Sequence, residues 1–155
     1  MSVVVAAAAI GAVLVAGIFF AFSTFVMGAL GRLAPGEGIR AMQAINVVVI
    51  NPWAMGALFG TGLLCVAAVT WAWIGGGPLR ATTLGAALLY VVGCIGVTAA
   101  CNVPLNDKLA AVAADDAAAH EMWRDYLVRW TSWNHVRTAA SLAAGVVLLL
   151  APHRA

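Results

Sequence analysis

Four long apolar stretches constrain this chain more than any other feature of its sequence. A helix needs about 20 mostly apolar residues to cross the hydrocarbon core of a membrane. Stretches of this kind lie at residues 3–30, 52–74, 80–101 and 136–150, with no charged residue in their interiors. The last is short unless Trp133 and Asn134 extend it. The sequence therefore predicts an all-α integral membrane four-helix bundle, one domain over residues 1–155, with spans at about 3–30, 52–74, 80–101 and 134–151.

The composition agrees with a chain that has lipid as its solvent. Hydrophobic residues make up 64% of the 155 residues and charged residues 9%, whereas an ordinary soluble domain is roughly 25% charged. The formal net charge of +2, with no run of like charges, gives no nucleic-acid surface. Three cysteines without a Cys-x-x-Cys pair favour neither a disulfide framework nor a zinc site. The first apolar run is too long for a signal peptide and is interpreted as a retained span.

The two ends of the predicted bundle differ in polarity. Four spans place both termini and the 75–79 turn on one side, and the 31–51 and 102–135 connections on the other, which we name the cap face. The cap face carries all six acidic residues and six of the eight basic residues. Because cytoplasmic loops are enriched in Lys and Arg, this asymmetry predicts a multi-pass protein with a cytoplasmic cap face. Arginines that serve a function of the cap itself would produce the same excess of basic residues on this face.

The connections of the cap face carry helical patterns of their own. Residues 38–50 are predicted to form a helix, and Pro104 is predicted to mark the end of the third span because proline interrupts a helix. In the second connection an apolar stripe repeats at i, i+3, i+4 and i+7, as Trp123, Tyr126, Leu127 and Trp130. The sequence therefore predicts a separate amphipathic cap helix at about 115–133.

His135 is the leading candidate for catalysis. It is the only titratable base in the segment WTSWNHVR, residues 130–137. A histidine pKa of about 6.5 suits proton transfer near neutral pH. The alternative is an interfacial histidine that hydrogen-bonds backbone or phospholipid, and the sequence leaves both interpretations open.

Five asparagines lie near the predicted ends of the spans on the cap face. An amide side chain both donates and accepts hydrogen bonds, so Asn46, Asn102 and Asn106 are predicted to hold a carbonyl or an oxyanion. Asn51 and Asn134 are predicted to bind substrate. Helix capping and turn formation are the alternative for all five, and a strong one for Asn51 and Asn134.

Two tryptophans and an arginine complete the candidate site. Trp130 and Trp133 could stack on a flat aromatic ligand, although anchoring at the membrane interface is the commoner role of tryptophan. Arg137 is predicted to bind an anion or to pair with Asp107, with phospholipid phosphate as the alternative partner. Metal ligation has weaker support, because His120 and Asp116 are the only pair with chelating spacing. No soluble-enzyme motif is present, and we predict no cofactor and no metal.

Several segments of the chain carry a family resemblance. They are GIFFAFSTFVM at 17–27, AMQAIN at 41–46 with NP at 51–52, GTG at 60–62, NVPLN at 102–106 and WTSWNHVR at 130–137. With these segments the chain resembles the DUF1772 family of small four-span membrane proteins, which includes the anthrone oxygenase-like proteins. The known activity of some relatives is oxidation of an anthrone to an anthraquinone with O2, without an organic cofactor.

The resemblance implies roles for particular residues. His135 would take the acidic proton of the anthrone. Asn102, Asn106 and Asn46 would stabilise the enolate oxygen, and Trp130 with Trp133 would stack on the rings. The enolate would then react with O2 as co-substrate.

Three classes of function remain compatible with the sequence. The first is an oxygenase or oxidoreductase acting on a lipophilic aromatic molecule. The second is a non-catalytic membrane protein that binds a lipid or a partner protein, for which His135 would be replaceable. The third is a transporter. It is disfavoured because transporters usually carry polar or ionisable residues near the middle of the membrane, where these spans offer only Ser23, Thr24, Thr61 and glycines. The Gly56-x-x-x-Gly60 pattern is compatible with a homo-oligomer and equally with packing inside one chain.

Overall fold

The computed structural model describes residues 2–75 and 79–151, and these form helices joined by turns and bends, with no strand among them. Several helices contain π-helical segments, named η, which have a wider turn than an α-helix. The elements are α1 (Val3–Ala21), η1 (Phe22–Val26), α2 (Met27–Leu30), α3 (Pro35–Val48), α4 (Pro52–Met55), η2 (Gly56–Gly60), α5 (Thr61–Gly75), α6 (Leu79–Tyr90), η3 (Val91–Gly96), η4 (Thr98–Asn102), α7 (Val103–Ala110) and α8 (Ala117–Leu149).

Three continuous helices are long and apolar enough to cross a membrane. They are Val3–Leu30 with 28 residues, Pro52–Gly75 with 24 and Leu79–Ala110 with 32. Three of the four predicted spans are therefore confirmed as helices that could cross. The fourth helix, α8, is 33 residues long, but polar residues around Asn134 and Arg137 lie in its middle.

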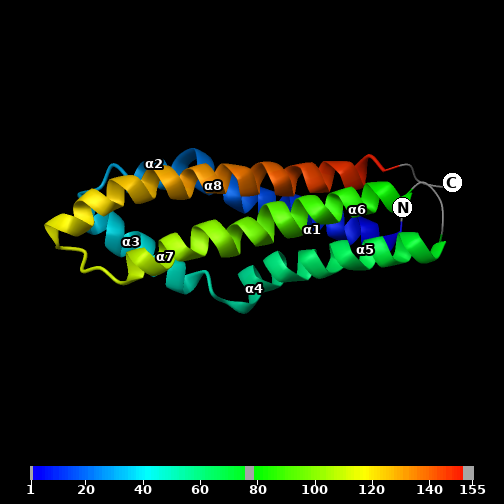
Figure 1. Cartoon of the computed structure of the whole chain (residues 1–155), viewed down its shortest axis with the longest axis horizontal. Helices are drawn as coiled ribbons and strands as arrows, with labels where there is room; N and C mark the ends of the chain where they lie inside the picture. Colours follow the sequence, from blue (N-terminus) through cyan, green and yellow to red (C-terminus); the bar gives the residue numbers. More distant parts are fainter. Residues whose placement is uncertain (1, 76–78, 152–155) are drawn as a thin grey trace.

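The long helices run beside one another along the long axis of the molecule (Figure 1). α1 packs against α8 and α5, and α6 packs against α5 and α8. Their contact surfaces are made largely of small side chains, including Ala8, Ala9, Ala12, Ala68 and Ala144, all fully buried. Large apolar side chains such as Leu14 and Phe20 point outward and are more than half exposed. Small side chains inside and large apolar side chains outside are expected where helices pack through small residues and lipid surrounds them.

At one end of the molecule a second core joins α3, α7 and the beginning of α8 (Figure 1). Ile39 and Met42 of α3 are buried there against Leu109 and Trp123. The side-chain amide of Gln43 donates to the carbonyl oxygens of Leu109 at 2.9 Å and Val112 at 3.1 Å. Because the last carbonyls of a helix lack partners within the helix, Gln43 ties α3 to the end of α7.

The prediction of a separate cap helix at 115–133 was wrong. α8 runs without a break from Ala117 to Leu149. Its buried side chains form one stripe of i+3 and i+4 steps: Ala119, Trp123, Tyr126, Trp130, Asn134, Arg137, Ser141, Ala144, Gly145 and Leu148. The aromatic stripe of the predicted cap helix and the buried residues of the predicted span thus lie on the same face of α8. One straight helix can therefore bury both sets of side chains.

Pro104 does not end the third long helix as predicted. The helix continues to Ala110, and Pro104 lies in the first turn of α7, directly after the π-helical η4. Proline lacks an N–H donor and clashes with the preceding turn of an α-helix. The wider turn of η4 before it accommodates this clash. α3 also differs from its predicted range of 38–50, since it begins at Pro35, a residue favoured in the first turn of a helix.

Close packing between α1 and α8 gives a test of the fold. A Cβ atom at Gly145 would lie 2.7 Å from Val13 Cγ2 and 3.2 Å from the carbonyl oxygen of Ala9. We therefore expect Gly145→Val to push α8 away from α1 and to lower the thermal unfolding temperature of the detergent-solubilised protein. Gly85→Val is the matched control, because a Cβ there meets nothing within 4 Å. Equal melting temperatures for the two variants would contradict this packing.

Candidate functional site

The most unusual side chain in the structure is Arg137 of α8, which is only 5% exposed. Its Nη2 donates to Asn134 Oδ1 at 2.7 Å and its Nη1 to Thr98 Oγ1 at 3.3 Å. The guanidinium carbon lies 4.2 Å from the ring centroid of Phe19 and 5.0 Å from that of Trp130. Across residues 2–75 and 79–151, no carboxylate lies within ion-pair distance of Arg137. An arginine keeps its charge in proteins, so the interior contains an uncompensated cation.

Asn134 holds this cation in place. Its Nδ2 donates to the carbonyl oxygen of Phe19 at 2.7 Å and to Ser23 Oγ at 2.8 Å, while its Oδ1 accepts from Arg137. The hydroxyls of Ser23 and Thr138 lie 3.2 Å apart, and Thr138 donates to the carbonyl oxygen of Asn134. The amide therefore links α1 and η1 to α8 and orients the guanidinium. We name this set, Ser23, Thr98, Asn134, Arg137 and Thr138, the Arg137 network.

Three buried polar atoms near Arg137 have no hydrogen-bond partner among the described residues. They are Asn102 Oδ1, Arg137 Nε and Ser141 Oγ. Asn102 is fixed by its other atom, since its Nδ2 donates to the carbonyl oxygen of Trp130 at 3.1 Å. Ser141 lies one helical turn beyond Arg137, and Asn102 one turn beyond Thr98. An unpaired buried polar group costs about 1–3 kcal/mol. Arg137 Nε could donate to an oxygen atom of a ligand, whereas Asn102 Oδ1 could only accept, from a hydroxyl or N–H group.

Beside the Arg137 network, Asn106 holds an aromatic stack. Its Oδ1 accepts from Trp130 Nε1 at 2.8 Å and from the Tyr126 hydroxyl at 2.9 Å. The rings of Trp123, Tyr126 and Trp130 follow one another, with centroids 5.4 Å and 6.3 Å apart. Burial raises the pKa of the Tyr126 hydroxyl, against a smaller opposite effect of the Asn46 side chain. The Tyr126 hydroxyl therefore stays protonated and donates to Asn106. Asn106 in turn positions the Trp130 ring, which contacts the guanidinium of Arg137.

The structure brings some of the predicted site residues together and leaves others apart. Asn102, Asn106, Trp130, Asn134 and Arg137 surround one interior region, and Asn46 lies at its edge beside Tyr126.

His135 and Trp133, in contrast, are exposed. Neighbouring residues of an α-helix are separated by about 100° of rotation, so His135 and Arg137 project to nearly opposite sides of α8. Asn51 caps α4, accepting from the backbone amides of Trp53 and Ala54 at 3.0 Å each.

Two predictions about these residues need correction. Arg137 pairs neither with Asp107, which is exposed, nor with lipid at the surface, because it lies on the buried stripe of α8. Asn134 lies in the middle of α8 and is no helix cap. Thr98, Ser141 and Phe19 were not predicted at all. Extending the stripe of Trp130 by further steps of four and three residues would have pointed to Asn134, Arg137 and Ser141.

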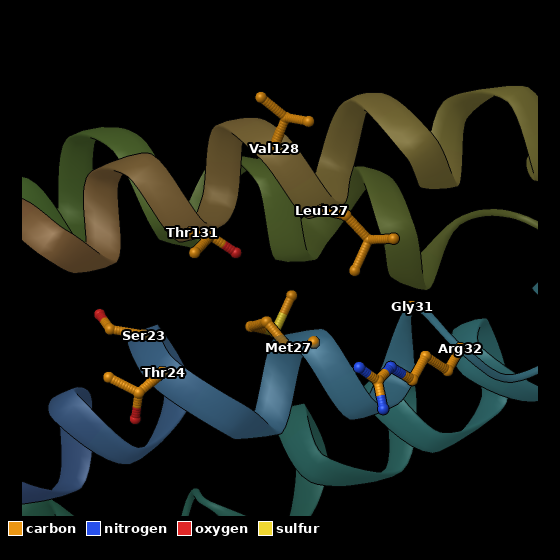
Figure 2. Close-up of a pocket in the computed structure, with 9 residues that line it drawn as sticks. Ser23, Thr24, Met27, Gly31, Arg32, Leu127, Val128 and Thr131 are labelled. Atoms are coloured by element: carbon orange, nitrogen blue, oxygen red, sulfur yellow. The ribbon is translucent and has the colours of Figure 1, made fainter.

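An open groove adjoins the Arg137 network (Figure 2). It has a volume of about 410 Å³ and runs between α8 on one side and η1 with α2 on the other. Its lining residues are Ser23, Thr24, Met27, Gly28, Gly31, Arg32, Leu127, Val128 and Thr131. Ser23 belongs both to the groove and to the Arg137 network, so the groove reaches the buried polar region from outside.

The helices and this region define an all-α protein with lipid-facing helices and a cation held inside. The family model described as anthrone oxygenase matches residues 49–147, well over half of the chain, and the chain therefore belongs to the anthrone oxygenase family. This confirms the family predicted from the sequence. No curated protein and no solved structure matches the chain. The described residues contain no group of three or more His, Cys, Asp or Glu side chains placed to share a metal ion.

Proposed function

We propose that this protein is a membrane oxygenase that oxidises a flat lipophilic substrate with O2, without an organic cofactor. The observation that carries the proposal is the buried guanidinium of Arg137, which has no carboxylate partner in the described chain. Keeping a charge inside a protein without a counter-ion is costly. It is reasonable where a negative charge develops during a reaction, because a preorganised donor then stabilises the transition state. Membership of the anthrone oxygenase family supports this assignment.

The chemistry would begin with loss of a proton from a CH2 group activated by a ring carbonyl. The resulting enolate carries its charge on oxygen, where Arg137 would stabilise it, with Asn134 holding the guanidinium, while Asn102 Oδ1 would accept from a hydroxyl of the substrate. Trp130 would contact the flat ring. Because stabilising the enolate makes the C–H more acidic, Arg137 contributes even when water accepts the proton.

The oxidation then balances with O2 alone. The enolate carbon forms a C–O bond with O2, electrons pass from carbon to oxygen, and the peroxide takes up one proton. Loss of the second C–H proton breaks the O–O bond and releases water. In sum, a CH2 group and O2 become a carbonyl group and water. The role of the protein is to hold the enolate and to keep its charged oxygen away from bulk solvent.

For the membrane arrangement, we propose that residues 134–151 form a fourth span, which completes a four-helix bundle. α8 packs along α1 and α6, two helices that could cross the membrane. Arg137 and Asn134 make it less apolar than the other three, but both face the interior. Intramembrane charged residues that face a bundle interior are commonly functional. Arg137 lies inside this span, and five of the eight basic residues remain on the cap face, so that face would be cytoplasmic.

The direct test is O2 consumption by the purified protein in lipid nanodiscs given a simple anthrone. We expect uptake above the spontaneous rate and formation of the corresponding quinone. Uptake no faster than with empty nanodiscs would contradict the anthrone reaction for this protein.

His135 provides a separate prediction about the proton acceptor. Because it lies on the opposite side of α8 from Arg137, we expect His135→Ala to keep kcat within about threefold of the wild type, well below the loss of about 100-fold or more typical of a general base. The measurement is kcat across pH values around neutrality. A large loss confined to kcat, with unchanged melting temperature, would instead assign the base to His135, as the family resemblance implies.

The alternative is a non-catalytic membrane protein that binds a lipid or a partner protein. The open apolar groove beside α8 favours it, since a lipid chain could lie there without any reaction. This alternative predicts lipid co-purification and no O2 uptake.

A further inference from the structure

The buried cation has part of its donor set unused. Arg137 is 5% exposed, and its Nη1 and Nη2 atoms donate to Thr98 and Asn134. The rings of Phe19 and Trp130 lie against the guanidinium and carry no charge. The Nε atom is buried and has no hydrogen-bond partner among residues 2–75 and 79–151. Neutral groups therefore hold the cation in place, and one N–H group is left for a further partner.

A second unused donor lies one helical turn farther along α8. Ser141 is fully buried, and its hydroxyl has no hydrogen-bond partner within the described part of the chain. A serine or threonine inside a helix can bond the carbonyl oxygen four residues earlier. Ser132 and Thr138 of the same helix do so, with Val128 and Asn134. The Ser141 hydroxyl makes no such bond and can donate to a ligand.

Both unused donors lie where α8 packs against η3 and η4. The Ser141 side chain lies beside that of Cys94. Arg137 bonds Thr98, whose hydroxyl donates to the carbonyl oxygen of Cys94 at 2.8 Å. α8 comes so close to η3 here that a Cβ atom at Gly93 would lie 2.6 Å from the side chain of Ala140. The two donors thus belong to one buried contact between α8 and the third long helix.

The third unpaired atom of this region, Asn102 Oδ1, lies on the other side of Thr98. Asn102 follows Thr98 by one helical turn, whereas Cys94, the neighbour of Ser141, precedes it by one turn. An amide oxygen can only accept a hydrogen bond and would repel a negative charge. A negatively charged ligand would therefore lie on the Ser141 side of Arg137, away from this oxygen.

We infer that Arg137 and Ser141 bind a small monovalent anion of the halide class when no substrate is present. A buried charge is stable only with a partner of opposite sign, and the two unused donors supply hydrogen bonds to that partner. One guanidinium calls for one negative charge, because a sulfate ion would leave an excess negative charge in the same interior. The inference goes beyond the proposed function, since it concerns the protein at rest.

The experiment measures thermal unfolding of the detergent-solubilised full chain in sodium bromide and in sodium gluconate at equal ionic strength. Bromide is the probe, and gluconate, a large hydrated carboxylate, is the reference anion. A ligand that binds only the folded protein raises the unfolding temperature as its concentration exceeds Kd. We expect bromide to raise that of the wild type by about 2–4 °C relative to gluconate.

Substitutions on α8 locate the bound anion. Arg137→Met should abolish the rise, and Ser141→Ala should weaken bromide binding at least about tenfold, as for loss of a hydrogen bond to a charged group. Ser141→Asp should also abolish the rise, because it places a carboxylate one turn from Arg137 as an internal counter-ion. Ser132→Ala and Arg129→Met, on the exposed side, are the matched controls and should keep the full rise. Each variant is compared with itself in the two salts, so a change in its overall stability does not alter the result.

Two results would overturn the inference. One is an equal unfolding temperature of the wild type in bromide and gluconate, which would mean that the unpaired atoms bind water only. The other is a bromide effect of wild-type size in Arg137→Met or Ser141→Ala, which would place the anion elsewhere. No step of this test uses turnover, so a failure of O2 uptake would refute the proposed function and leave the anion site standing. Conversely, normal O2 uptake with no bromide effect would refute the anion site alone.

Discussion

Replacing Arg137 with methionine should lower kcat for anthrone oxidation by at least about 100-fold, the usual effect of losing one oxyanion donor, while the protein stays folded. Methionine has a similar volume and no charge, so the cost of burying a cation without a counter-ion disappears. The substitution also leaves Asn134 Oδ1 without its donor, which costs about 1–3 kcal/mol. Because the two changes oppose each other, the melting temperature of Arg137→Met should stay close to that of the wild type. A structural arginine would behave differently, because its loss would lower activity and stability together.

The control for this prediction lies on the same helix. Arg129 is exposed and forms only an i, i+4 ion pair with Asp125 at 3.3 Å. Exposed pairs of this kind contribute about 0.3–0.5 kcal/mol, so Arg129→Met should change neither kcat nor melting temperature appreciably. Arg137→Lys should recover part of the activity, since lysine restores the charge but not the planar fork of donors. Wild-type turnover in Arg137→Met would exclude Arg137 from the reaction.

The second large effect is expected at Asn134 and concerns stability. Asn134→Leu keeps the approximate shape of the side chain but removes the bonds to Phe19, Ser23 and Arg137. It leaves a buried guanidinium with one partner fewer, and such a change costs about 2–4 kcal/mol. We expect a correspondingly lower free energy of unfolding in a denaturant titration of the detergent-solubilised protein.

Ser132→Ala is the matched control for Asn134→Leu. Ser132 is two residues away on the exposed side of α8, and its hydroxyl bonds only the carbonyl oxygen of Val128. Its free energy of unfolding should stay within about 0.5 kcal/mol of the wild type. If Asn134→Leu proved equally mild, Asn134 would not be what holds the Arg137 network together.

The two variants also separate orientation from charge. Asn134→Leu retains the cation but loses the group that aims it, so any folded fraction should keep more activity than Arg137→Met. This ordering follows from the geometry, because Asn134 acts through its bond to Arg137, whereas Arg137 keeps an unpaired Nε of its own.

Sequence patterns alone were sufficient for the helical class, for three helices that could cross a membrane and for the family. A long apolar run indicates a helix that can be surrounded by lipid, whichever helices it packs against. The same sequence also pointed to Asn102, Asn106, Trp130, Asn134 and Arg137, because polar residues are rare enough in such a chain to stand out. It grouped them with His135 and Trp133, which the structure leaves exposed.

Only the tertiary structure decided which of these residues face inward. Asn134, His135 and Arg137 are near neighbours in sequence, and the choice among them depends on the phase of α8. That phase is set by the packing of α8 against α3 and α7 near Trp123 and against α1 and α6 farther along, so that one stripe is buried from Trp123 to Leu148. A pattern of apolar residues shows the buried side only while the stripe is apolar. Where the stripe passes through Asn134, Arg137 and Ser141 it looks like a solvated surface in the sequence, and only contacts with Phe19, Ser23 and Thr98 from distant segments reveal it as the interior.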